Sequence, residues 1–91
     1  MYEHVEVWKR VRAGVVIRFQ CWRRLSDGSV AVQSADVLRN ETYKTDLRKS
    51  DERLVELLLE EDPGERCCWF PSLMQAISEH ELSFADMPGQ L

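Results

Sequence analysis

The sequence has no long apolar run, no even set of cysteines and no recognisable catalytic motif. None of its segments approaches the roughly 18 consecutive apolar residues that a membrane-spanning helix requires, so we expect no membrane span. The opening stretch MYEHVEVWKR contains acids and lacks the apolar core of a signal peptide. Three cysteines, an odd number, disfavour the disulfide framework of a small secreted domain. These absences together favour a cytoplasmic protein.

The scarcity of metal ligands and activated nucleophiles bears on enzymatic function. No segment resembles a glycine-rich phosphate loop, a nucleophile elbow or a paired-carboxylate site. Cys67 and Cys68 are adjacent, and neighbouring side chains of an extended chain point to opposite sides, so the two do not converge on one zinc ion. We therefore expect no catalytic residue, no cofactor and no metal, with one cysteine packed inward and the other facing outward. A thiol-dependent enzyme that uses Cys67 or Cys68 is one alternative function.

What the sequence does contain is strongly segregated charge. The net charge is −4, from 12 basic and 16 acidic residues. The segment 9–24 holds six basic residues and no acid, whereas residues 51–91 hold ten acids against two arginines. Opposite charges in the two parts of a chain favour attraction within the chain, between two copies, or toward a partner.

The first third of the chain shows the two-residue period of strands that are buried on one side. Asp27-Gly28 is a strong signal for a two-residue hairpin turn, and Gly14 suits the left-handed position of a three-residue loop. These turns predict three consecutive antiparallel strands, the third over about residues 30–38. The rival interpretation makes residues 3–12 a short helix, because Val5, Trp8 and Val11 also fit a helical period.

The registers that these turns imply sort the strand residues onto two faces. Val7 is expected opposite Phe19, and Cys21 opposite Ser34. The apolar face then comprises Val5, Val7, Val11, Val15, Ile17, Phe19, Cys21, Val30 and Val32. The polar face comprises Trp8, Arg10, Arg18, Gln20, Trp22, Arg24 and Gln33.

Two helices are predicted in the second half of the chain. The first runs from about Asp46 or Asp51 to Glu61, and Asp62-Pro63-Gly64 ends it. The second follows Ser72, which forms a capping-box pattern with the glutamine three residues later. The apolar residues of the first helix cover about 200° of its circumference, wider than a single stripe needs. This excess indicates packing against a second helix or another protomer.

These elements predict one α+β domain, a three-stranded antiparallel β-meander followed by two α-helices packed on one face. We expect residues 1–84 to form this domain and residues 85–91 to be a flexible C-terminal tail. The stretch RCCWF before the second helix is expected to be extended, and a short edge strand is the alternative.

The polar sheet face is the sharpest functional candidate. It would present a partner-binding surface of Trp8, Arg10, Arg18, Trp22 and Arg24. Tryptophan and arginine dominate the binding energy of protein interfaces, so we expect a non-enzymatic protein-interaction or regulatory module that forms a homodimer or binds a protein partner. The alternative is a nucleic-acid-binding module, since such a face can stack bases and hold phosphates, although the acidic net charge counts against it. The third interpretation assigns no binding role to this face, because these side chains would then pack within the molecule.

Overall fold

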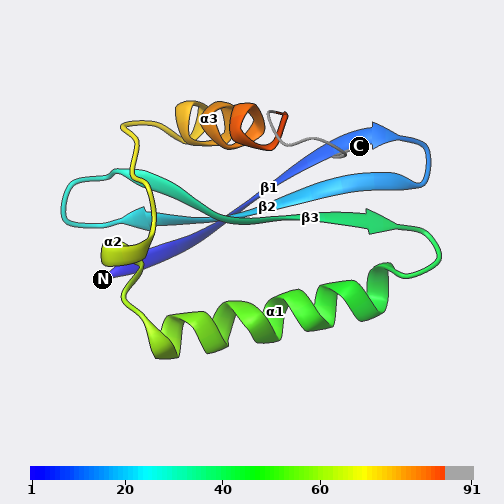
Figure 1. The fold of residues 1–91 in the computed structure, drawn as a ribbon, viewed down its shortest axis with the longest axis horizontal. Helices are drawn as coiled ribbons and strands as arrows, with labels where there is room; N and C mark the ends of the chain where they lie inside the picture. Colours follow the sequence, from blue (N-terminus) through cyan, green and yellow to red (C-terminus); the bar gives the residue numbers. More distant parts are fainter. Residues whose placement is uncertain (86–91) are drawn as a thin grey trace.

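Three antiparallel strands form one sheet, and helices lie on both of its sides (Figure 1). The structure is a computed structural model that describes residues 1–85, with side chains as far as Leu82. The strands are β1 (Tyr2–Arg12), β2 (Val15–Arg24) and β3 (Val30–Arg39), and the helices are α1 (Tyr43–Glu60), α2 (Pro63–Arg66) and α3 (Leu73–Ala85). The predicted three-stranded meander followed by helices is confirmed, and the rival helix over residues 3–12 is wrong.

The two long helices lie on opposite faces of the sheet, which corrects the prediction that both pack on one face (Figure 1). The helix α3 packs Ala76 and Ile77 against Phe19 on the apolar face. The helix α1 instead contacts the polar face, where its Ser50 bonds to Gln20. Successive residues of a strand point to opposite faces, so Phe19 and Gln20 each receive a different helix.

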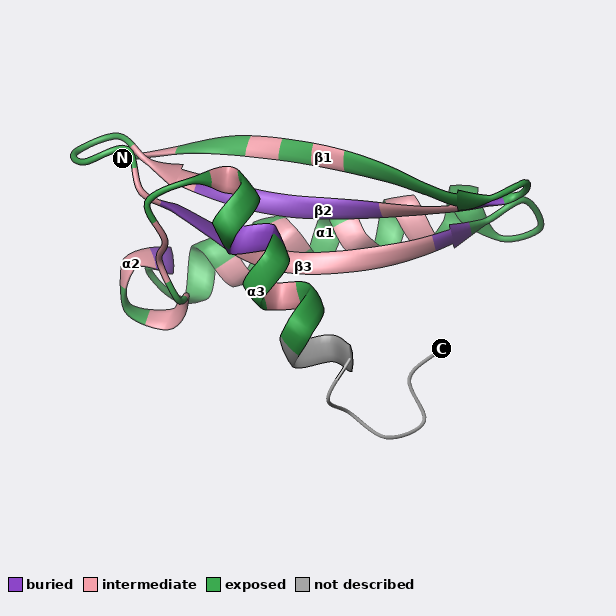
Figure 2. Ribbon diagram, turned by 90° about the horizontal axis from the view of Figure 1, so that it is seen from above, coloured by how far each residue is buried: buried purple, intermediate pink, exposed green. Residues whose placement is uncertain are grey.

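The apolar core lies between β2 and α3. It consists of five buried residues, Phe19, Cys21, Val30, Ala76 and Ile77, with partly buried neighbours from all three strands around them. The middle strand β2 is the most deeply buried element, because it has a strand on each side and a helix over each face (Figure 2). The core is small, as expected for a chain of this length.

The strand registers agree with the sequence over most of the first hairpin and depart from it beside its turn and in the second hairpin. Arg12 pairs with Val15 and the register shifts between Arg10 and Arg12, so the first loop is Ala13-Gly14 rather than the predicted three residues. Val7 pairs with Phe19, as predicted. Cys21 pairs with Val32 rather than Ser34, and the register shifts between Gln20 and Cys21 because β3 carries one extra residue there. The second hairpin loop also spans residues 25–29 rather than two, so the register that the turn implied is wrong. A β-bulge of this kind adds a residue without moving the flanking side chains to the other face.

The segments around the helices follow the sequence signals with small shifts. The helix α1 begins at Tyr43, three residues before the earliest predicted start, and the hydroxyl of Thr42 donates to Asp46 in its first turn at 3.0 Å. Phe70 in the RCCWF stretch forms a single antiparallel bridge with Val30, and Ser72 caps α3 by accepting from the backbone N–H of Gln75 at 3.2 Å. The predicted tail, residues 85–91, lies outside the described residues from residue 86 onward.

No helix within residues 1–85 combines the length and apolarity that crossing a membrane requires.

Candidate functional site

The five residues of the predicted binding face lie in three different environments. Arg18 and Trp22 are buried, with 3% and 5% of their surface exposed. Arg24 is half-buried, whereas Trp8 is 52% exposed and Arg10 is exposed. These side chains therefore do not form one continuous open surface, and their joint role in binding a partner stays a prediction.

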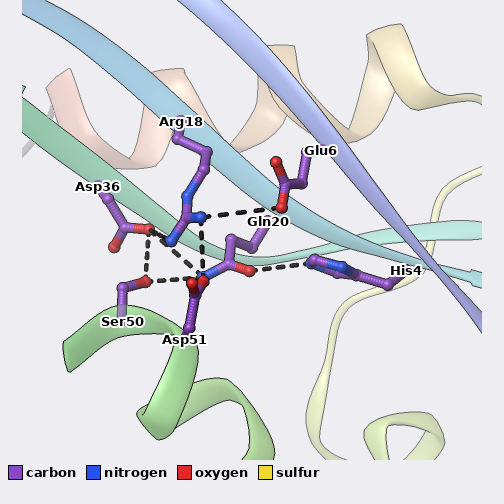
Figure 3. Close-up of polar contacts among 7 residues, drawn as sticks. All are labelled: His4, Glu6, Arg18, Gln20, Asp36, Ser50 and Asp51. Carbon is purple, nitrogen blue, oxygen red and sulfur yellow. Dashed lines mark hydrogen bonds and ion pairs between the residues drawn. The ribbon is translucent and has the colours of Figure 1, made fainter. Parts of the chain in front are cut away.

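Arg18 lies at the centre of a polar network between the sheet and α1 (Figure 3). Its guanidinium approaches Asp36 on β3 at 3.3 Å, Asp51 on α1 at 3.0 Å and Glu6 on β1 at 3.8 Å. An arginine this deeply buried needs opposite charge and hydrogen bonds to offset the loss of hydration. The surrounding carboxylates pair the charge of Arg18 within the molecule, while its buried Nε has no hydrogen-bond partner among the described residues.

Gln20 joins the same network to two further elements (Figure 3). Its side chain is fully buried, and its amide nitrogen donates to Ser50 Oγ at 2.7 Å while its amide oxygen accepts from His4 Nε2 at 2.9 Å. Ser50 in turn donates to Asp36 at 2.6 Å. Ser50 has no imidazole partner here, since His4 bonds to the amide of Gln20, and Asp36 also accepts from the guanidinium of Arg18. The network joins α1 to the sheet.

Little in the sequence indicates this network. The two-residue period places Gln20 and Arg18 on the polar face, but no motif or spacing marks Asp36 and Ser50 as their partners. The position of Gln20 is the one indication, because a residue at the centre of the middle strand is the residue most readily covered by another element of the fold. Such a residue must find hydrogen-bond partners from the covering element.

Trp22 and Arg24 belong to an aromatic cluster that the α2–α3 connection closes. The ring of Trp22 lies between those of Tyr2 and His4, at centroid distances of 6.4 Å and 5.4 Å. Trp69 stacks on Tyr2 at 5.9 Å, and the guanidinium of Arg24 lies 4.5 Å from the Trp69 ring centroid. For Trp22 and Arg24, these contacts agree with the interpretation that the tryptophan and arginine side chains of the polar face pack within the molecule.

Trp8 and Arg10 border a groove at the other end of the sheet, beside the β1–β2 hairpin. This hairpin-end groove has a volume of about 370 Å³, and its lining includes Trp8, Arg10, Arg12, Leu38, Arg39 and Tyr43. Leu38 is buried and forms part of an apolar floor, while Trp8 and Tyr43 are partly exposed aromatic walls from β1 and α1. The combination of an apolar floor with a few polar groups at the rim is typical of small-ligand sites.

The rim of the hairpin-end groove is basic and held in place. Arg10, Arg12 and Arg39 make no ion pair with any described residue. The backbone N–H of Asn40 donates to the carbonyl of Gly14 at 3.1 Å, which ties the hairpin to the β3–α1 loop. Gly14 has φ of +80°, a conformation that glycine adopts without strain.

A second hollow, of about 290 Å³, lies beside the adjacent cysteines. Cys67 and Cys68 line it together with Arg66 and His80. Burial raises the pKa of the Cys67 thiol, and the favourable charge of Arg66 offsets this only in part. Burial lowers the pKa of His80. The Cys67 thiol is therefore protonated at neutral pH, which leaves it a weak nucleophile.

The arrangement of the cysteines agrees with the sequence prediction, since Cys67 is half-buried and Cys68 is exposed. Residues 1–85 contain no group of three or more histidine, cysteine or acidic side chains placed to hold a metal ion.

Two further surfaces are open. The strand β1 pairs only with β2, so its outer edge has no strand neighbour in the described part of the chain. The helix α1 has no buried residue, and its outer side exposes Val55, Leu58 and Leu59, the last at 83%. The predicted apolar excess on this helix is therefore present on its surface.

No family model, no curated protein and no solved structure matches the chain. Functional assignment therefore rests on these surfaces and on the chemistry of their residues.

Proposed function

We propose that the protein is a small non-enzymatic interaction module that associates with a second copy of itself through the edge of β1. The observation that carries this proposal is the free edge of an 11-residue strand. An unpaired edge presents a row of backbone N–H and C=O groups, which is a template for another strand. Pairing of two β1 strands would extend the three-stranded sheet to six strands.

The charge pattern of β1 favours a second copy in antiparallel orientation. The first half of the strand carries Glu3 and Glu6, and the second half carries Lys9, Arg10 and Arg12. Antiparallel pairing brings the acidic half of each strand beside the basic half of the other. A register centred on Trp8 sets Glu6 opposite Arg10 of the other copy, and opposite charges directly across a strand pair are stabilising.

The exposed apolar side of α1 supports an interaction role as well. Val55, Leu58 and Leu59 lie close together along the helix, and a helix without buried residues gains little from its own sheet. Clustered exposed apolar side chains of this kind often mark a protein contact. We assign this side of α1 to a further protein partner rather than to the β1 interface.

The state of the thiols is consistent with a module that lacks its own chemistry and works in a reducing compartment. All three cysteines are free. Burial raises the pKa of Cys21 to about 11 and also raises that of Cys67, so neither is an activated thiolate. We propose a cytoplasmic location on the same ground, because free thiols persist there.

Sedimentation velocity on the full chain tests the self-association. We expect a dimer at tens of micromolar, and Arg10→Glu is expected to weaken it at least about tenfold by setting two carboxylates opposite each other. Glu6→Arg is expected to do the same, and an equimolar mixture of the two variants should recover the dimer, because each hybrid pair regains opposite charges. Circular dichroism on each variant checks that it is folded.

Arg53→Glu is the matched control, since it makes the same charge change on exposed α1 away from β1. A wild-type chain that stays monomeric at tens of micromolar would refute the proposal. So would a dimer that Leu59→Glu abolishes and Arg10→Glu leaves intact, because the interface would then lie on α1.

Alkylation kinetics test the absence of a thiol-dependent activity. We expect Cys67 and Cys68 to react with iodoacetamide at neutral pH no faster than free cysteine, with Cys67 slower than Cys68. A markedly faster reaction at either residue would instead support the thiol-enzyme alternative.

A further inference from the structure

The hairpin-end groove shares Trp8 and Arg10 with the proposed β1 interface, and it adds Leu38, Arg39 and Tyr43, which that interface does not use. We propose that it binds a nucleotide, either free or as one unit of a single-stranded nucleic acid. The shared chemistry is a flat aromatic base that carries a phosphate. The groove has both an apolar, aromatic interior and an unpaired basic rim.

The interior suits a planar base. The buried side chain of Leu38 lies on the floor, and the aromatic rings of Trp8 and Tyr43 border it from two elements, β1 and α1. Stacking on such rings stabilises a bound base and requires no particular base sequence. The guanidinium of Arg18 lies 5.8 Å from the Trp8 ring centroid, so this ring is already held in place before a ligand arrives.

The rim suits a phosphate. Arg10, Arg12 and Arg39 line the groove, and none is paired with a described carboxylate. The guanidinium group binds phosphate through parallel hydrogen bonds. The α1 helix also begins at Tyr43 beside the groove, and its first amides lack a side-chain cap. The positive end of the helix dipole adds to the attraction for an anion.

The acidic net charge of −4 does not oppose this assignment locally. Of the carboxylates around the groove, Glu6, Asp36 and Asp51 are engaged by Arg18, Asp46 accepts from the hydroxyl of Thr42, and Glu41 adjoins the lining residue Asn40. Most other acids lie on the C-terminal half of α1 and beyond it in the sequence. Fields from charges more than about 10 Å apart are largely screened at ordinary salt, so the local arginines decide which ion binds.

A nucleotide fits these residues better than an acidic peptide does. A peptide carboxylate would use the arginines but would not require two aromatic rings beside an apolar floor. The groove, of about 370 Å³, lies between the strand ends and the start of α1, and a volume of this size suits a compact ligand.

Titration followed by two-dimensional NMR of the uniformly 15N-labelled chain tests the proposal. The probes are 5′-AMP, a short oligothymidylate and inorganic phosphate, each at low and at moderate salt. We expect saturable shifts confined to residues of the groove with 5′-AMP. Tighter binding per molecule of the oligonucleotide, with a steep dependence on salt, would identify a strand as the source of the base, and equal affinity would identify the free nucleotide.

Variants of residues outside β1 separate this site from self-association. Tyr43→Ala is expected to weaken 5′-AMP binding about fivefold by removing a stacking ring, with no effect on inorganic phosphate. Arg39→Glu is expected to weaken both ligands at least about tenfold by replacing a phosphate contact with a repelling charge. Arg53→Glu, which makes the same charge change on the outer side of α1, should change neither.

Three results would overturn the proposal. One is the absence of saturable shifts with 5′-AMP at millimolar concentration and low salt. Another is inorganic phosphate that binds as tightly as 5′-AMP with Tyr43→Ala silent, which would mean an adventitious ion only. The third is an oligoglutamate peptide that binds more tightly than either nucleotide ligand. Sedimentation measures self-association and none of these three results. Failure of the nucleotide site can therefore be distinguished from failure of the β1 interface.

Discussion

The two faces of the sheet hold their helices by different means. On one face, α3 buries Ala76 and Ile77 against Phe19 and Cys21, and apolar burial dominates. On the other face, α1 has no buried residue and is attached through Ser50 and the polar network around it. One sheet therefore presents an apolar and a polar way of docking a helix within the same small domain.

The difference teaches what each kind of contact supplies. Apolar burial stabilises by about 25 cal/mol per Å² and has no preferred direction. A hydrogen bond contributes only about 1 kcal/mol net, yet it is lost with a small displacement and costs more when one partner is removed. We therefore expect α3 to carry more of the stability of the fold, and the polar network to fix where α1 lies.

Phe19→Ala tests the apolar side of this comparison and should have the largest effect. Phe19 is 2% exposed, and truncating a buried phenylalanine leaves a cavity and costs about 3–5 kcal/mol. Urea denaturation measures the free energy of unfolding. Val55→Ala on the exposed side of α1 is the control and should cost less than about 0.5 kcal/mol. Equal losses for the two variants would contradict the assignment of the core to this face.

Asp36→Ala tests the polar side and should have the next largest effect. The change removes the carboxylate that accepts hydrogen bonds from the hydroxyl of Ser50 and from Nη2 of Arg18, and the Arg18 side chain stays buried. Leaving buried donors without a partner is expected to cost about 2–4 kcal/mol in the free energy of unfolding. Glu52→Ala, which removes an exposed carboxylate from α1, should be nearly neutral. A loss below about 1 kcal/mol for Asp36→Ala would show that the network is dispensable.

Raising the pH probes the apolar face through Cys21, with a smaller expected effect. Burial raises the pKa of Cys21 from its usual value of 9.0 to about 11 in the folded chain. Between these values the unfolded chain releases the proton and the folded chain keeps it, so stability falls as the pH rises through this window. Denaturation curves at several alkaline pH values measure the decline. Cys21→Ala should flatten it more than Cys68→Ala, and equal curves would refute the assignment.

Ser50→Ala is the mildest variant and separates the two helices most directly. It removes one bridging hydroxyl and should cost about 1 kcal/mol. Native-state hydrogen exchange should show the loss mainly in the amides of α1, because that helix opens before the rest of the fold. Slow amides of β2 and α3 should change less. A uniform acceleration would mean that α1 and α3 open together and that the two faces are one cooperative unit.

The first hairpin could be predicted well from the sequence because local and long-range signals agree there. The alternation of apolar residues and the glycine at position 14 both support one register, and Val7 does pair with Phe19. The second hairpin could not be predicted to the residue. The loop is longer than Asp27-Gly28 alone implies, and nothing in the local pattern marks Gln33 as the extra residue opposite the Gln20 to Cys21 step.

The side of the sheet that each helix covers could not be read from the sequence at all. The polar face looked solvated because it contains arginine and glutamine. Those side chains are covered because their partners, Asp36, Ser50 and Asp51, come from elements up to some thirty residues further along the chain. Pattern reasoning sees the polarity of a residue and not the partners that topology brings to it.

The candidate site was predicted in part for the same reason. Trp8 and Arg10 are exposed as a binding role requires, whereas Arg18, Trp22 and Arg24 make intramolecular contacts. Tyr43 and Arg39, which complete the groove, lie between the predicted third strand and the predicted first helix, where the sequence pattern indicates no element. Their position beside Trp8 depends on the tertiary structure.

The hydrogen bond from the buried amide of Gln20 fixes the position of α1 on the sheet, and this contact does not involve the outward-facing residues of the helix. Ser50 is its contact on α1, and this contact lies on the inner side. The outer positions, including Val55 and Leu59, can therefore be rewritten without moving the helix axis. New recognition residues can therefore be introduced on the outer side of α1 while the sheet beneath the helix stays unchanged.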